Sequence, residues 1–104
     1  MKDAMQQVRV IADRLKKEYK AQRVILFGSY ATGKARRDSD VDLLIIAPTI
    51  ERFYQRMATV KRLIRDLRNG LPIAPIVLTQ KEIHGRIKKG DQFVIGILDE
   101  GVEL

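Results

Sequence analysis

A glycine and a serine close one short apolar run of this chain, and a pair of aspartates opens the next. Gly28 and Ser29 follow residues 24–27, and Asp40 and Asp42 stand at the start of a run that ends at residue 47. Short apolar runs bounded by turn residues predict buried strands. A turn of small residues lets phosphate oxygens approach the backbone, and two carboxylates can hold a divalent cation. The pattern therefore favours binding of a nucleoside triphosphate.

The aspartate pair points to a particular kind of metal site. Two residues apart on a strand, Asp40 and Asp42 leave the same face, about 7 Å apart along the backbone. Carboxylates this close repel each other, which raises the pKa of at least one of them unless a cation neutralises the pair. The chain has no cysteine and one histidine, so the ligands must be mainly oxygens, which indicates Mg²⁺ or Mn²⁺. Asp40 and Asp42 are the predicted metal ligands and catalytic residues.

The loop after the first run supplies the predicted phosphate-binding residues, Gly28, Ser29 and Lys34. Gly28 leaves the main-chain amides open, Ser29 adds a hydroxyl donor, and a helix starting here would add free N–H groups. Lys34 could neutralise phosphate charge, although a loop lysine is usually solvated. A Gly-Ser pair alone is an ordinary turn, and a lone Asp-X-Asp can be a surface turn. Their combination at this spacing is what predicts a nucleotide site.

Apolar periodicity predicts the remaining elements. Spacings of three and four favour a helix over the first twenty residues and another over residues 53–67, whose apolar stripe is either core or a partner surface. Pro75 inside a third strand suggests an edge position or a bulge. The predicted elements, in chain order, are helix 1–20, strand 24–27, strand 41–47, helix 53–67, strand 73–78, helix 80–89 and a last short helix to about residue 100. This order predicts one α/β (α+β) domain, residues 1–104, with a small mixed sheet packed with helices.

Composition narrows the function classes. The chain has 104 residues and a formal net charge of +7, with 20 Lys and Arg against 13 Asp and Glu. Such charge favours anionic partners, but the aromatic residues do not interleave with the basic ones as a base-stacking surface requires, so nucleic acid is not the expected partner. There is no apolar run of eighteen residues and no signal-peptide pattern, so we expect a cytoplasmic protein with no membrane association. His84 is expected on an exposed helix face, and self-association stays open.

Residues 28–42 resemble the minimal nucleotidyltransferases of the DNA polymerase β-like superfamily. The hallmark of that family is Gly-Ser, ten residues and then Asp-X-Asp, and Ala31 and Gly33 also fit its pattern. The resemblance covers nearly the whole chain and implies the polymerase β-like fold. It also implies Mg²⁺-dependent transfer of a nucleoside monophosphate, AMP from ATP above all, to an acceptor hydroxyl. Many members are antitoxins encoded beside a HEPN-domain partner, which some of them modify with AMP, so a HEPN protein is the implied partner.

One position departs from that family pattern. Relatives carry a third carboxylate on the next strand, as base or second metal ligand, where this chain has Ala74. Two-metal catalysis would lose a ligand there, and the acceptor hydroxyl would be harder to deprotonate. Three hypotheses follow: an active nucleotidyltransferase, a catalytically impaired module that binds nucleotide or a partner protein, and an accessory nucleic-acid binder based on the basic segment 51–70.

Overall fold

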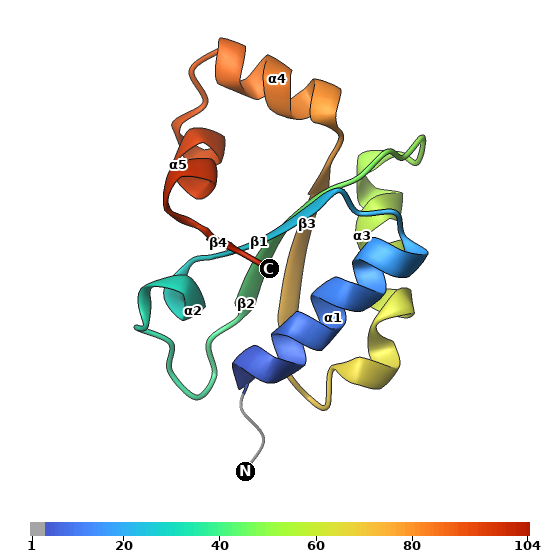
Figure 1. Ribbon diagram of the computed structural model, residues 1–104, viewed down its shortest axis with the longest axis vertical. Coiled ribbons are helices and arrows are strands. Elements are labelled where there is room, and N and C mark those ends of the chain that lie inside the picture. The colour runs from blue at the N-terminus through green and yellow to red at the C-terminus, as the bar shows by residue number, and fades with distance from the viewer. Residues whose placement is uncertain (1–3) are drawn as a thin grey trace.

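A four-stranded mixed sheet forms the centre of the protein, as the computed structural model of residues 4–104 shows (Figure 1). The strands are β1 (Arg23–Phe27), β2 (Val41–Ile46), β3 (Ile73–Leu78) and β4 (Val102–Glu103), in the spatial order β3-β2-β1-β4. β2 pairs antiparallel with β1 and parallel with β3, and β4 pairs antiparallel with β1. The predicted single layer of mixed strands packed with helices is confirmed.

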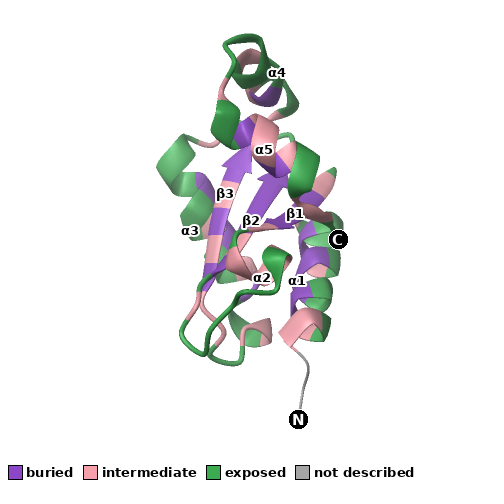
Figure 2. Cartoon of the chain, turned by 90° about the vertical axis from the view of Figure 1, so that its left-hand side faces the viewer, coloured by how far each residue is buried: buried purple, intermediate pink, exposed green. Residues whose placement is uncertain are grey.

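Helices cover both faces of the sheet. α1 (Ala4–Glu18) and α3 (Phe53–Leu63) lie on one side, and α4 (Gln80–Lys88) and α5 (Gln92–Glu100) lie on the other (Figure 1). β2 is therefore buried on both faces, as its continuous apolar run predicts (Figure 2). Leu43 and Ile45 belong to the core under α1, whereas Leu44 and Ile46 belong to the core under α4 and α5. Within residues 4–104, no helix is long and apolar enough to cross a membrane. Residues 1–3 of the predicted first helix lie outside the described part of the chain.

β4 was not predicted, because two residues carry no periodic signal. Its place depends on Gly101, which ends α5 and lets the chain turn back along β1. A Cβ at Gly101 would stand 2.6 Å from the carbonyl oxygen of Ile97 and would also overlap the Ile25 side chain. The edge position suggested by Pro75 is confirmed, since β3 is the outer strand.

The helix predicted over residues 53–67 is shorter in the structure, and its apolar stripe is only partly core. The helix ends at Leu63, and a short 3₁₀ turn, η1 (Arg65–Leu67), follows it. Val60 is buried, but Phe53 is 51% exposed and Met57 is 36% exposed. The position facing the sheet one turn before Val60 belongs to Arg56, which is 7% exposed. Hydropathy could not find it, because a charged residue there is stable only through partners supplied by the tertiary structure.

Arg56 has those partners. Its guanidinium donates to the backbone oxygens of Val77 (3.1 Å) and Glu51 (3.0 Å) and to Glu82 Oε1 (2.6 Å). The Val77 carbonyl belongs to the edge strand, so Arg56 satisfies a polar group that β3 would otherwise leave open. Glu82 also accepts from the Thr79 backbone N–H (2.8 Å), where it closes the capping box of α4. This cluster joins α3, β3 and α4 at one end of the sheet.

Candidate active site

Gly28 and Asp42 are in contact where β1 ends beside the start of β2. Phe27 pairs with Asp42 across the antiparallel ladder, so the next residue of β1, Gly28, passes over the Asp42 side chain. A Cβ at Gly28 would lie 3.2 Å from Asp42 Cγ and would overlap its carboxylate oxygen. Gly28 also has φ 75° and ψ −152°, a backbone region that is essentially restricted to glycine. Space and backbone geometry therefore both require glycine at this position.

A single turn of helix, α2 (Ser29–Thr32), begins immediately after this contact. The Gly28 carbonyl accepts hydrogen bonds from the N–H groups of Ala31 (3.1 Å) and Thr32 (3.2 Å), which fixes the turn. Ser29 is therefore held one residue from the Asp42 contact. Gly33, with φ 75°, closes the turn. Gly28, Ser29 and Asp42, predicted from separate parts of the motif, are brought to one place.

Lys34 is placed differently. Its backbone N–H donates to the Ser29 carbonyl at 2.9 Å, so the residue helps to close α2. Its side chain is exposed and lines neither of the two cavities described below. The structure thus gives Lys34 a backbone role in the loop, and it does not bring the ammonium group to the aspartates.

Asp40 and Asp42 line the same cavity, which we call the β3 cavity. It has a volume of about 450 Å³ and crosses the edge strand, with Asp40, Asp42 and Ala74 on its wall together with Met57, Lys61 and Arg68. Asp40 is exposed just before β2, and Asp42 is half-buried within it. Burial raises the pKa of Asp42, and the negative charge of Asp40 raises it further. This is the repulsion expected from the sequence, and a divalent cation between the two carboxylates would relieve it.

Ala74 occupies the sheet position beside Asp42. The two residues are register partners in the parallel β2–β3 pair, and both line the β3 cavity. No group of three or more Asp, Glu, His or Cys side chains in residues 4–104 is arranged to hold a metal. Glu82, a spare carboxylate in the sequence, is committed to Arg56 and to the cap of α4. The donor set therefore fits one cation shared with a ligand's own oxygens, and Ala74 places a methyl group beside Asp42.

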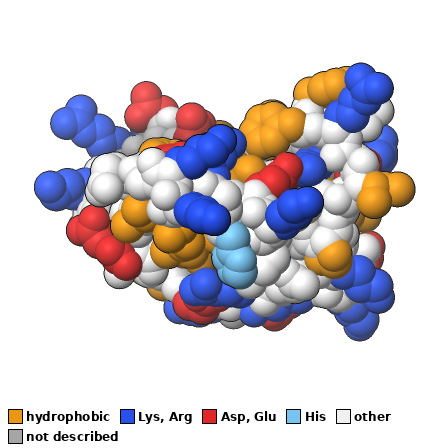
Figure 3. Space-filling model, turned by 90° about the horizontal axis from the view of Figure 1, so that it is seen from above, with side chains coloured by type: hydrophobic (Ala, Val, Ile, Leu, Met, Phe, Trp, Pro, Cys, Tyr) orange, Lys and Arg blue, Asp and Glu red, His pale blue; other side chains and the backbone are white. Residues whose placement is uncertain are grey.

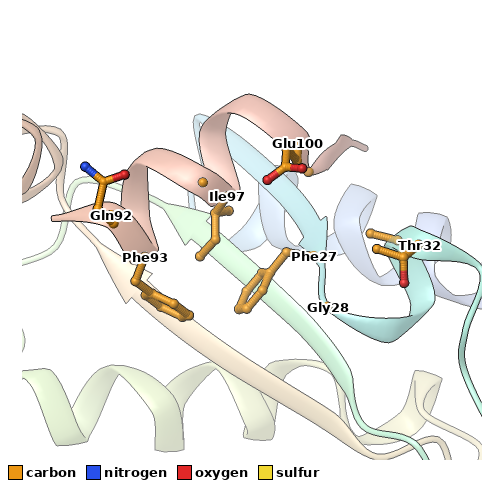
Figure 4. Close-up of a pocket in the computed structure, with 10 residues that line it drawn as sticks. Phe27, Gly28, Thr32, Gln92, Phe93, Ile97 and Glu100 are labelled. Carbon is orange, nitrogen blue, oxygen red and sulfur yellow. The ribbon is translucent and has the colours of Figure 1, made fainter.

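A second cavity lies beside the same junction. We call it the α5 cavity; it has a volume of about 310 Å³ and lies between α2, the end of β1 and α5 (Figure 4). Gly28 belongs to its wall, as do Phe27, Thr32, Phe93, Gly96 and Glu100. Gly28 in this cavity touches Asp42 in the β3 cavity, so the two cavities meet at the predicted site.

Sequence reasoning missed most of the residues around the two cavities. Lys61 and Arg68 were noted only as members of a basic segment, and no local signal placed them in one cavity with the aspartates. Phe93 and Glu100 lie more than 60 residues from Gly28 in the chain, and only the packing of α5 beside β1 brings them near it. His84 is exposed as expected, at the surface of the face drawn in Figure 3, and lines neither cavity.

Comparison with known proteins identifies a family whose matched region includes the candidate site. The family described as Nucleotidyltransferase domain matches residues 8–102. Three Methanocaldococcus jannaschii proteins, each named "Putative protein adenylyltransferase", are 36%, 34% and 39% identical over 78, 70 and 59 residues. These matches cover 72%, 67% and 56% of this chain and 52%, 68% and 60% of the relatives. The chain thus spans about half the length of the first of them.

A solved structure shows the same fold. The crystal structure of a "putative nucleotidyltransferase" from Sulfolobus solfataricus superposes with a TM-score of 0.52 and 25% sequence identity, over 86% of this chain and 81% of that one. The family match includes all of β1, α2, β2 and β3, and so both sides of the Gly28–Asp42 contact. The chain belongs to the nucleotidyltransferase domain family, whose class of activity is nucleotidyl transfer.

Proposed function

We propose that this chain transfers a nucleoside monophosphate, AMP from ATP, to an acceptor hydroxyl. The observation that carries the proposal is the contact between Gly28 and Asp42. It holds a phosphate-compatible turn against a carboxylate pair that is short of positive charge. Magnesium is the expected cation, with manganese as a substitute, because both prefer oxygen ligands. The names of the three archaeal relatives support the adenylyl group as the moiety transferred.

Different residues of this chain would bind the phosphates and the cation. The open backbone at Gly28, the Ser29 hydroxyl and the first N–H groups of α2 would hold the phosphates of the nucleotide. Asp40 and Asp42 would hold the cation, which when bound neutralises phosphate charge as the transfer proceeds. In the reaction, the acceptor oxygen bonds to the α-phosphorus and the bond to the pyrophosphate oxygen breaks. The proton of the acceptor hydroxyl passes to water in the β3 cavity, because Ala74 offers no base.

The acceptor would enter through the β3 cavity. Lys61 and Arg68 line this cavity together with the aspartates, and Met57 adds an apolar side chain. Cationic side chains here favour an acceptor with acidic groups beside its hydroxyl. The relatives are named as protein adenylyltransferases, which favours a protein acceptor. A HEPN-domain toxin is the proposed partner, and modification of it would give this chain the role of an antitoxin.

A second candidate function rests on Ala74. With a methyl group at the register position beside Asp42, the chain could bind Mg²⁺-nucleotide and a partner protein with little turnover. This impaired-module hypothesis predicts nucleotide binding of ordinary affinity and very slow transfer, since loss of a general base costs about 10²- to 10⁴-fold in rate.

An assay with labelled ATP distinguishes the active transferase from the impaired module. The protein is incubated with Mg²⁺, the product of the neighbouring gene, and ATP labelled on either the α- or the γ-phosphate. Nucleotidyl transfer moves the α-label to the acceptor and releases the γ-label in pyrophosphate. An Asp42→Asn variant serves as the inactive control. No transfer together with Mg²⁺-dependent ATP binding would favour the impaired module, and absence of both would reject the nucleotide site.

A further inference from the structure

We infer that the α5 cavity is the nucleoside subsite. Phe93 is the surface on which the base stacks, and the missing side chain of Gly96 leaves the space that the nucleoside occupies. This inference rests on the proposed function and deepens it, because it assigns the part of the nucleotide that the phosphate and metal residues do not contact. The class of ligand is a nucleoside with its base and ribose, joined to a triphosphate that lies at Gly28.

Position is the first argument. The α5 cavity has Gly28, the residue that touches Asp42, on its wall, and its other lining residues come largely from α5 (Figure 4). A nucleotide whose phosphates lie at Gly28 and Ser29 can therefore place its nucleoside here and leave the β3 cavity open to the acceptor. Its volume of about 310 Å³ lies at the lower end of the range usual for small-molecule sites.

The chemistry of the wall is the second argument. Phe93 is 55% exposed although it packs edge-on against Phe27, with ring centroids 5.7 Å apart and an interplanar angle of 86°. An aromatic ring that is more than half exposed, in a cavity that also contains Gly28, is suited to stack on a purine or pyrimidine. Glu100 is exposed on the cavity wall, and within residues 4–104 its carboxylate makes no ion pair or hydrogen bond. It can accept hydrogen bonds from ribose hydroxyls or from base amino groups.

The third argument is the gap at Gly96. Glycine in the middle of a helix lowers its stability by about 1 kcal/mol relative to alanine, and Gly96 stands in the middle of α5. A Cβ at Gly96 would meet no atom within 4 Å, so packing against other elements does not require the glycine. What its missing side chain does leave is space in the cavity wall. Any larger side chain at this position would project into the space assigned to the nucleoside.

Cavity filling tests the inference. Calorimetry in the presence of Mg²⁺ measures the affinities of ATP and of inorganic tripolyphosphate, which carries the phosphates without the nucleoside. We expect Gly96→Leu to weaken ATP binding by about tenfold or more, as expected for lost stacking, and to leave tripolyphosphate within about twofold. Gly85→Leu is the matched control: Gly85 also lies inside a helix, α4, has no atom within 4 Å of its added Cβ, and lies outside the cavity. It should change neither affinity.

A fluorescence signal gives a second readout that does not depend on filling the cavity. The chain contains no tryptophan, so Phe93→Trp introduces a single reporter on the cavity wall. ATP should quench this reporter and tripolyphosphate should not. The inference is overturned if the wild type binds both ligands equally and Gly96→Leu leaves ATP affinity unchanged, or if the reporter does not distinguish them. If the wild type binds neither ligand, the proposed function fails first and the nucleoside subsite fails with it.

Discussion

Gly28 touches the Asp42 carboxylate so closely that no side chain fits between them. The two residues are 14 positions apart in the chain, and the antiparallel pairing of β1 with β2 places them together by matching Phe27 with Asp42. Two halves of the sequence motif thus become one surface, with the turn predicted to bind phosphate after one strand and the carboxylate predicted to bind metal on its neighbour.

Gly28→Ala should lower both stability and nucleotide affinity. The backbone at Gly28 is strained for any other residue, which costs about 1–3 kcal/mol, and the added methyl group would displace the Asp42 carboxylate. Gly33→Ala is the control, because Gly33 also has a positive φ of 75° but has no atom within 4 Å of an added Cβ. Denaturant unfolding should show the larger loss for Gly28→Ala, and ATP binding should fall only there. Adding Asp42→Ala to Gly28→Ala should recover part of the lost stability, whereas no recovery would contradict the contact.

Asp42→Asn should stabilise the metal-free protein at neutral pH. Burial and the charge of Asp40 raise the folded-state pKa of Asp42, so its ionised form lowers the free energy of unfolding once the pH exceeds the ordinary aspartate pKa. The penalty grows until the pH passes the raised pKa and is then constant. Thermal unfolding should therefore give a higher Tm for Asp42→Asn at pH 7 and no difference near about pH 3, where Asp42 is protonated in both states.

Mg²⁺ should make the Tm of the wild type higher than that of Asp42→Asn. A cation held by Asp40 and Asp42 binds only the folded protein and raises its Tm, and Asp42→Asn removes one of the two ligands. A Tm increase with millimolar Mg²⁺ in the wild type, largely absent in the variant, is the expected result. Equal increases in both proteins would place the cation elsewhere.

Ala74→Asp should strengthen cation binding and speed nucleotidyl transfer. The new carboxylate would stand at the register position beside Asp42 on the wall of the β3 cavity. Without Mg²⁺ it adds repulsion, so Tm should fall; with Mg²⁺ the rate should rise by about 10²-fold, as for a restored general base or metal ligand. Ala74→Asn, of the same shape but neutral, is the control. If both variants transfer AMP at the wild-type rate, Ala74 does not limit turnover.

Lys61→Gln and Arg68→Gln should weaken use of an acidic acceptor. Both residues line the β3 cavity that also contains the aspartates, so neutralising either should raise the KM for a protein acceptor by about fivefold at low salt and by less at high salt. Arg62→Gln removes the same charge from the exposed surface of α3, outside the cavity, and should leave KM unchanged. A similar rise for Arg62→Gln would mean that only overall charge matters.

Arg56→Met should destabilise the fold without acting on the site. Arg56 is buried and bonds the edge strand, the loop before α3 and Glu82. Its hydrogen bond to Glu82 is the main reason that the pKa of Glu82 is lowered. We expect a loss of about 2 kcal/mol in the free energy of unfolding, against less than about 0.5 kcal/mol for the exposed control Arg62→Met. The contribution of the Arg56–Glu82 pair to the free energy of unfolding should also decrease as the pH drops and Glu82 is protonated.

The sequence predicted the elements that local pattern controls. The apolar runs of β1, β2 and β3 and the stripe of α1 were found because burial on a regular element repeats at a fixed period. Pro75 indicated an edge because a residue without an N–H cannot donate to a ladder on both sides. The spacing of Gly28 and Asp42 also indicated one site, although it could not show that they touch.

Other features depended on contacts between distant parts of the chain. Arg56 faces the sheet only because Glu82 and Val77 supply its partners, and β4 forms only because Gly101 allows the turn back along β1. Neither has a periodic signal, so no local pattern could reveal it.

The sequence by itself thus determined which residues are candidates for phosphate and metal binding, because a tight turn and paired carboxylates are local properties of the chain. Tertiary structure alone decided that Ala74 stands beside Asp42, that Lys61 and Arg68 line one cavity with the aspartates, and that a second cavity opens under α5. Strand register and helix packing set these relations by bringing together surfaces that must be buried against each other, and residues far apart in sequence have no other way to become neighbours.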